Sequence, residues 1–178
     1  MKATKELGRR KALNYLVYEP LSLLFRLIPY SPLKVNFLRF LGAKIRKNSV
    51  IWNIKFFNVY VNGFKNLTLG KDSFIGEDCL LDLADKIIIG NKVTLAERVN
   101  ILTHTNVGYK DHPLQKKYSK KLGKVIIKDG CFIGTNSTIL SGVTINNNSL
   151  VAANSLVKED VPPNTLVGGS PAKKIKNI

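Results

Sequence analysis

Aliphatic residues recur at every sixth position over most of this 178-residue chain. The longest unbroken run is Ile127, Ile133, Ile139, Ile145, Val151 and Val157. A shorter run, Leu69, Ile75 and Leu81, slips by two residues and resumes at Ile89, Leu95 and Ile101. A period of six fits neither an α-helix, with 3.6 residues per turn, nor a long strand with alternating side chains. It predicts short strands joined by regular bends, with the aliphatic residues inside coils that stack in parallel.

The first forty residues have a different pattern, with apolar residues three and four positions apart. The members of this set are Leu13, Leu16, Val17, Leu21, Leu24, Phe25 and Ile28. Such spacing predicts one face of an amphipathic helix, and Pro20 on the same face either kinks this helix or begins a second one. A further short helix is expected, with Ser31 as its N-cap, Pro32 in its first turn and Gly42 at its C-terminal end.

This apolar face admits two interpretations. It can cover the open first coil of the stack behind it, because the exposed end of a parallel β stack needs protection. It can instead attach to an anionic membrane surface, with Arg9, Arg10, Lys11 and Arg26 near the lipid head groups. The sequence leaves both interpretations open.

The N-terminal segment does not have the pattern of an export signal or a transmembrane helix. Its apolar stretch is interrupted by Glu19, Pro20, Arg26 and Pro29, and no small-residue cleavage pattern follows. Cys79 and Cys131 lack the spacing of a disulfide framework or a zinc site, which favours two buried, reduced thiols. We therefore expect a cytoplasmic protein, and the membrane interpretation of its first helix would place it at the cytoplasmic face of the membrane.

The organisation expected from these patterns has three parts. They are a helical cap over residues 1–44, a β-helix domain over 45–160 and a C-terminal tail over 161–178. Residues 105–124, TNVGYKDHPLQKKYSKKLGK, break the hexad period with a polar, lysine-rich stretch. An insertion in a solenoid projects as a loop from one face and often lines a site, although a tolerated surface insertion is the alternative.

The net charge indicates an anionic partner. The chain has 28 Lys and Arg against 12 Asp and Glu, a formal charge of +16. Candidates are nucleic acid, an anionic membrane, an acidic carrier protein, a phosphorylated cofactor and an anionic polysaccharide. Nucleic acid is not expected, because the basic residues are not interleaved with an aromatic platform and no binding motif is present.

Residues 45–178 resemble the hexapeptide-repeat acyltransferases, in particular the sugar O-acetyltransferases. The most specific segment is V-x-E-D-V-P-P-N-T-x-V-x-G-x-P-A-K-x-I, at residues 157–175. The resemblance implies an all-β solenoid, a left-handed parallel β-helix, assembled as a homotrimer with active sites between subunits. It also implies direct acetyl transfer from acetyl-CoA, without a metal and without an acyl-enzyme.

Acetyl transfer from a thioester to an alcohol needs a base for the hydroxyl proton and a donor for the tetrahedral oxyanion. Histidine suits the first role, and the chain has two, His104 and His112. His104 ends a strand-like hexad just before the inserted loop. The resemblance implies that the base of the family lies at this position, so we expect His104 to be catalytic. A half-exposed histidine that only ends the coil is the alternative. Many relatives have a histidine where this chain has Asn106, which departs from the family pattern.

The resemblance also suggests binding residues. The pantetheine arm of CoA is expected near Thr135 and Ala153, where small residues allow an extended ligand to approach the backbone. Its phosphates are expected near Lys158, Lys173 and Lys176, although these lysines are equally consistent with ordinary solvated surface. The acceptor is expected near Asp82, Asp85 and His112.

The sequence therefore predicts an O-acetyltransferase acting on a sugar hydroxyl, in the biosynthesis of a surface polysaccharide. Acyl carrier protein as donor, and an amine or an antibiotic as acceptor, are the alternatives within enzymes. A non-catalytic β-helix is the alternative outside them. A zinc enzyme on the same fold would need three histidine ligands, and the chain has two.

Overall fold

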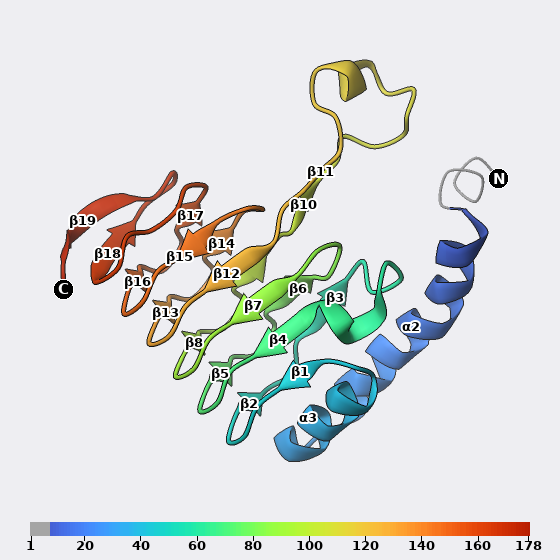
Figure 1. Cartoon of the computed structure of the whole chain (residues 1–178), viewed down its shortest axis with the longest axis horizontal. Coiled ribbons are helices and arrows are strands. Elements are labelled where there is room, and N and C mark those ends of the chain that lie inside the picture. Colours follow the sequence, from blue (N-terminus) through green and yellow to red (C-terminus); the bar gives the residue numbers. More distant parts are fainter. Residues whose placement is uncertain (1–7) are drawn as a thin grey trace.

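The computed structural model describes residues 8–178 as a stack of coils with two helices at one end (Figure 1). Residues 1–7 lie outside the described residues. They are the beginning of the N-terminal segment for which no export signal is expected. Each coil contributes one short strand to each of three sheets, so the stack has a triangular cross-section. Within residues 8–178, no helix has the length and apolar character needed to cross a membrane.

The three sheets are parallel, apart from one strand at the C-terminus. Sheet one contains β1 (Lys44–Ile45), β4 (Leu67–Leu69), β7 (Ile87–Ile89), β12 (Val125–Ile127) and β15 (Thr144–Ile145). Sheet two contains β2 (Val50–Ile51), β5 (Phe74–Ile75), β8 (Thr94–Leu95), β13 (Phe132–Ile133), β16 (Leu150–Val151), β18 (Thr165–Gly168) and the antiparallel β19 (Lys173–Asn177). Sheet three contains β3 (Lys55–Phe57), β6 (Leu80–Asp82), β9 (Asn100–Ile101), β14 (Thr138–Ile139) and β17 (Leu156–Val157).

The hexad positions form the core. All twelve aliphatic residues of the two sequence runs are at most 1% exposed. Equivalent positions stack in register, so that Leu69 pairs with Ile89, Ile89 with Ile127 and Ile127 with Ile145. The all-β solenoid expected from the six-residue period is therefore confirmed.

The coils approach one another too closely for side chains at some bends. A Cβ atom added to Gly70 would lie 2.2 Å from the carbonyl oxygen of Gly90 in the next coil. One added to Gly134 would lie 2.5 Å from the backbone nitrogen of Ala153. Because real atoms do not approach this closely, glycine at these bends is required by the stacking of backbone on backbone.

The helices begin and end slightly differently from the expectation. Helix α2 (Arg9–Leu27) continues through Pro20, so this proline does not begin a second helix. Helix α3 (Ser31–Phe40) has Tyr30 as its N-cap, one residue earlier than expected, because the Ser31 hydroxyl accepts a hydrogen bond from the Ile51 backbone N–H instead. Gly42 follows the helix with a φ of +96°, in agreement with its expected role at the C-terminal end.

The apolar set predicted for one helix face divides between two faces of α2. Phe25 is fully buried, with its ring centroid 5.3 Å from that of Phe56, and Leu21 packs against the same core. Four other members of the set, Leu13, Leu16, Val17 and Leu24, are exposed. Helix α2 contacts β3, and α3 contacts β1 and β2, so both helices lie against the first coil while an outer apolar face of α2 stays open.

The inserted loop projects from the stack as a hairpin (Figure 1). Strands β10 (His104–Thr105) and β11 (Lys121–Leu122) pair antiparallel at its base, and its tip carries the short 3-10 helix η2 (Pro113–Lys116). A second irregular segment, with the 3-10 helix η1 (Gly63–Asn66), connects β3 to β4. His104 therefore lies where the regular coil ends and the hairpin begins.

Candidate active site

His104 is held by a buried carboxylate from the preceding coil. Its Nδ1 lies 2.5 Å from Oδ2 of Asp82, the last residue of β6. The side chain of His104 is 21% exposed and that of Asp82 is 0% exposed. One edge of the imidazole ring is therefore fixed inside the protein, while part of the ring reaches solvent at the base of the hairpin.

Asp82 is surrounded by hydrogen-bond donors. Its Oδ1 accepts from Nδ2 of Asn58 at 2.6 Å and from the Ala84 backbone N–H at 3.1 Å, and its Oδ2 accepts from the Thr103 backbone N–H at 2.8 Å. Burial by itself raises the pKa of Asp82, but the hydrogen bonds from Asn58, His104, Thr103 and Ala84 together bring it below its ordinary value. The carboxyl group is consequently ionised at neutral pH.

This arrangement fixes the tautomer of His104. An ionised carboxylate can only accept hydrogen bonds, so the proton between the two groups belongs to Nδ1. The neutral ring then carries its lone pair on Nε2, the nitrogen that a general base uses. Asn58 also lies beside the ring, with Nδ2 3.3 Å from Nδ1, and its own Oδ1 accepts a 2.9 Å hydrogen bond from the Tyr60 hydroxyl.

Thr103 locks the backbone next to the histidine. Its hydroxyl donates to the Asp82 carbonyl oxygen at 2.7 Å and accepts from the Asp85 backbone N–H at 2.9 Å. The side chain is fully buried. Thr103, Asp82 and Asp85 therefore hold the two coils together directly behind His104.

The predicted acceptor residues have different surroundings. Asp82 is fully buried and its oxygens accept from four donors, so it holds His104 and does not face an acceptor. Asp85 is half-buried and its Oδ1 accepts from the Lys86 backbone N–H at 2.7 Å. His112 is exposed in the hairpin, where its Nδ1 accepts from the Leu114 backbone N–H and caps η2.

Two residues of the site were not found by sequence reasoning. Asn58 contacts both Asp82 and His104, and the ring of Phe57 lies 6.0 Å from that of His104 between centroids. Phe57 is half exposed, so it offers an aromatic face beside the histidine. The signal that could have found them is the stacking of β3 on β6, which pairs Phe57 with Asp82.

The predicted pantetheine residues lie at another corner of the triangle. Thr135 and Ala153 follow β13 and β16, at the bends between sheets two and three, whereas His104 lies after sheet three. The Thr135 hydroxyl donates to Glu97 Oε2 at 3.4 Å, and Ala153 is exposed. One chain therefore does not bring these two residues beside His104.

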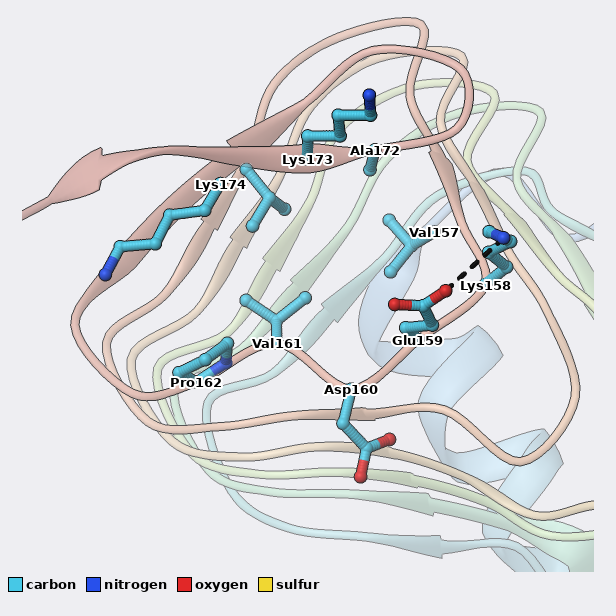
Figure 2. A pocket seen from close by; sticks show the side chains of 10 residues that line it. Val157, Lys158, Glu159, Asp160, Val161, Pro162, Ala172, Lys173 and Lys174 are labelled. Carbon is cyan, nitrogen blue, oxygen red and sulfur yellow. Dashed lines mark ion pairs between the residues drawn. The ribbon is translucent and has the colours of Figure 1, made fainter.

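Two of the three predicted phosphate-binding lysines share a pocket of about 290 Å³ at the C-terminal end of the stack (Figure 2). Lys158 and Lys173 line it, but Lys158 pairs with Glu159 at 3.3 Å. Lys176 does not line this pocket; it pairs with Leu166 in the β18–β19 ladder. Lys174 lines the pocket instead, and sequence reasoning had not selected it.

The cysteines do not have the surroundings of nucleophiles. Burial raises the pKa of the Cys79 thiol to about 11, and burial also raises the pKa of Cys131. Their thiols donate to the backbone oxygens of Ala96 at 3.1 Å and of Asn146 at 3.0 Å. A thiolate, the nucleophilic form, is therefore rare at both positions at neutral pH. Over residues 8–178, no group of three His, Cys, Asp or Glu side chains is placed to hold a metal ion.

This chain matches a hexapeptide-repeat family and several proteins that are named acetyltransferases. The profile of the bacterial transferase hexapeptide family (six repeats) matches residues 124–159. A putative acetyltransferase of Schizosaccharomyces pombe is 41% identical over 118 residues, which are 64% of this chain but only 54% of that protein. A putative colanic acid biosynthesis acetyltransferase of Escherichia coli is 31% identical over 139 residues, 78% of this chain and 71% of that protein.

Two solved structures extend the similarity to nearly the whole chain. A hexapeptide-repeat acetyltransferase of Vibrio cholerae, complexed with acetyl coenzyme A, has a TM-score of 0.80 and 26% identity, over 93% of this chain and 87% of that one. A maltose O-acetyltransferase of Clostridium difficile has a TM-score of 0.80 and 28% identity, over 96% and 89%. The left-handed parallel β-helix expected for this chain is the fold that it shares with them.

Proposed function

This chain belongs to the hexapeptide-repeat acetyltransferases, and we propose that it transfers the acetyl group of acetyl-CoA to a sugar hydroxyl with His104 as the general base. The observation that carries this proposal is the contact between His104 Nδ1 and the buried Asp82 carboxylate. It leaves Nε2 unprotonated on the partly exposed side of the ring, which is what a base for an alcohol requires.

The proposed reaction has two proton transfers. His104 Nε2 takes the hydroxyl proton as the acceptor oxygen attacks the thioester carbonyl carbon, which forms a tetrahedral intermediate. The C–S bond then breaks, and the imidazolium returns the proton to the sulfur, so that acetyl ester and free CoA thiol leave. Asp82 stabilises the imidazolium between these steps and holds the ring in place.

Acetyl-CoA as the donor agrees with the Vibrio cholerae relative solved with that ligand. We propose that Thr135 and Ala153 contact its pantetheine arm, and that Lys158, Lys173 and Lys174 lie near its phosphates. Because Thr135 and Ala153 occupy a different corner from His104, the complete site requires a second chain. A homotrimer would satisfy this requirement, since a cyclic assembly places one corner of each subunit against a different corner of its neighbour.

A sugar acceptor is supported by the surroundings of His104. The half-exposed ring of Phe57 lies beside the imidazole, and an aromatic face suits the apolar face of a sugar ring. A relative in Escherichia coli is named for colanic acid biosynthesis, and another relative in Clostridium difficile is a maltose O-acetyltransferase. We therefore propose a sugar of a surface polysaccharide as the acceptor.

The experiment that tests the proposal is release of free CoA thiol from acetyl-CoA against a panel of mono- and oligosaccharides, with the full chain and His104→Ala. We expect release that depends on a sugar, and a loss of about 10²- to 10⁴-fold in kcat for His104→Ala. The protein's own buried thiols do not interfere, because their raised pKa values suppress the reaction with a thiol reagent.

A matched control for kcat is His112→Ala, which removes the other histidine from the exposed hairpin and should leave kcat near that of the unchanged protein. If His104→Ala retains near-normal turnover, the base assignment is wrong. If the panel gives no sugar-dependent release but an amine does, the acceptor class is wrong, whereas release only from an acyl carrier protein thioester would overturn the donor.

A further inference from the structure

The outer face of α2 is a continuous apolar stripe that the fold does not use. It comprises Leu13, Leu16, Val17, Pro20, Leu23, Leu24 and Leu27. The large apolar side chains in it are between 48% and 78% exposed. An amphipathic helix normally turns its apolar side to the core, yet here Tyr18, Leu21 and Phe25 on the opposite side already make that contact. The stripe is therefore a second apolar face without a partner in residues 8–178.

Positive charges lie at both ends of this stripe. Helix α2 begins with Arg9, Arg10 and Lys11 and has no acidic residue in its first turn. The partial positive charge of a helix N-terminus favours acidic residues there, so three cations in this position are unfavourable for the isolated helix. At the other end, Arg26 borders a pocket of about 310 Å³ with Leu23 and Leu27. An anionic partner would offset the repulsion at the first end and pair with the charge at the second.

We propose that α2 docks on an anionic lipid surface, lying flat with this outer stripe in the membrane interface. Helix α2 has exposed apolar side chains along one face and cations at both ends of that face. This is the composition of helices that lie in the membrane interface. Negatively charged head groups attract such cations. A second copy packed stripe against stripe is the less favourable occupant, because it would bring the same arginines of two molecules together.

Docking in this way would place the corner of the stack that carries His104 near the lipid. Nδ2 of Asn14 donates to the Tyr60 carbonyl oxygen at 3.0 Å, and the Tyr15 and Tyr60 rings lie 5.9 Å apart. Tyr60 in turn contacts Asn58, which contacts Asp82 and His104. An acceptor carried on a lipid would therefore be delivered close to His104; this consequence rests on the proposed function, whereas the docking itself does not.

The test is co-sedimentation of the full chain with vesicles of phosphatidylcholine alone or mixed with phosphatidylglycerol. We expect the protein to pellet with the mixed vesicles, to be released by salt and to remain in solution with phosphatidylcholine alone. The variant Leu16→Glu, which places a carboxylate in the stripe, should bind at least tenfold more weakly. Arg9→Gln with Arg10→Gln should weaken binding about fivefold per cation removed.

A matched control is Ile178→Glu, which places the same carboxylate on an equally exposed apolar residue far along the chain. It should bind the mixed vesicles as the unchanged protein does. Sugar-dependent thiol release, measured without lipid, should be unchanged in all variants, which separates failure of docking from failure of the proposed function.

Two results would overturn the proposal. One is an unchanged protein that stays in solution with mixed vesicles at low salt. The other is a stripe variant that pellets with the mixed vesicles as fully as the unchanged protein does. If instead the stripe variant lowers the molar mass measured by light scattering, the stripe belongs to an interface between copies and the lipid assignment is wrong.

Discussion

Asn58 donates a 2.6 Å hydrogen bond to Asp82, the carboxylate that holds His104, across 24 residues of chain. The same amide nitrogen lies 3.3 Å from His104 Nδ1, and the Tyr60 hydroxyl fixes the amide from its other side. Asn58 therefore orients the acid and the base together, although it has no position from which to take the acceptor's proton.

We expect Asn58→Gly to lower kcat by about ten- to a hundredfold with little change in the KM for acetyl-CoA. Glycine is the suitable replacement because Asn58 has a φ of +57°, which would strain alanine. The measurement is thiol release over a range of acetyl-CoA concentrations. Asn48→Gly is the matched control, because Asn48 also has a φ of 57° and also bonds an aspartate 24 residues away, Asp72. An equal loss in both variants would assign a structural role to Asn58.

The lowered pKa of Asp82 predicts a pH-dependent contribution to stability. Its unfolded carboxyl, with a pKa of about 4, binds protons at a pH where the folded one is still ionised. The free energy of unfolding should therefore gain from Asp82 above about pH 5 and lose that gain as the pH falls through the folded pKa. Asp82→Asn should lack this loss.

The measurement is urea unfolding of the unchanged protein and Asp82→Asn at intervals between pH 3 and pH 7. The other carboxyl groups are common to both proteins and cancel in the difference. We expect this difference in free energy to shrink toward acid. A difference that stays constant with pH would mean that the pKa of Asp82 is not lowered by folding.

The separation of the His104 corner from the Ala153 corner predicts complementation between subunits. His104→Ala and Ala153→Trp should each be inactive alone, the second because an exposed tryptophan blocks the donor path. Co-refolded in equal amounts, they should recover activity in roughly a quarter of the sites, if each site takes one corner from each of two chains. No recovery in verified mixed oligomers would place both corners of a site in one chain.

The close stacking at Gly70 predicts a strong effect of a single methyl group. Gly70→Ala should lower the free energy of unfolding by about 1–3 kcal/mol or more, because its Cβ meets the rigid Gly90 backbone. The control is Gly168→Ala, whose nearest atoms are 3.0 Å away and belong to the side chains of Ala152 and Ile175. Thermal unfolding of the two variants should separate them clearly; similar midpoints would contradict the steric argument.

Much of the fold could be predicted because the six-residue period is local and marks twelve aliphatic positions along the chain. Each repeat places one aliphatic residue in the core, so no knowledge of distant contacts is needed. The position of His104 followed similarly, since the hexad run ends there and the polar insertion begins.

The rest depended on geometry that the sequence pattern does not carry. Asn58 lies beside His104 because the bends that follow β3, β6 and β9 stack on one another. These bends differ in their number of residues, so the six-residue period does not predict the contact. The two faces of α2 could not be separated by spacing alone, because a helix that is apolar on both sides matches the same period. Lys174 replaces Lys176 at the pocket because the β18–β19 register shifts between Leu166 and Val167.

The two ends of the stack have a consequence for how the protein behaves at high concentration. A column of parallel coils is in principle open to growth, since the last rung of one molecule could accept the first rung of another and produce a fibre. Helices α2 and α3 occupy the first rung. At the other end, β19 runs antiparallel to β18 and carries three lysines. A reversed, charged strand cannot pair with a further parallel rung, so the edge of sheet two that β19 covers disfavours end-to-end growth of the stack.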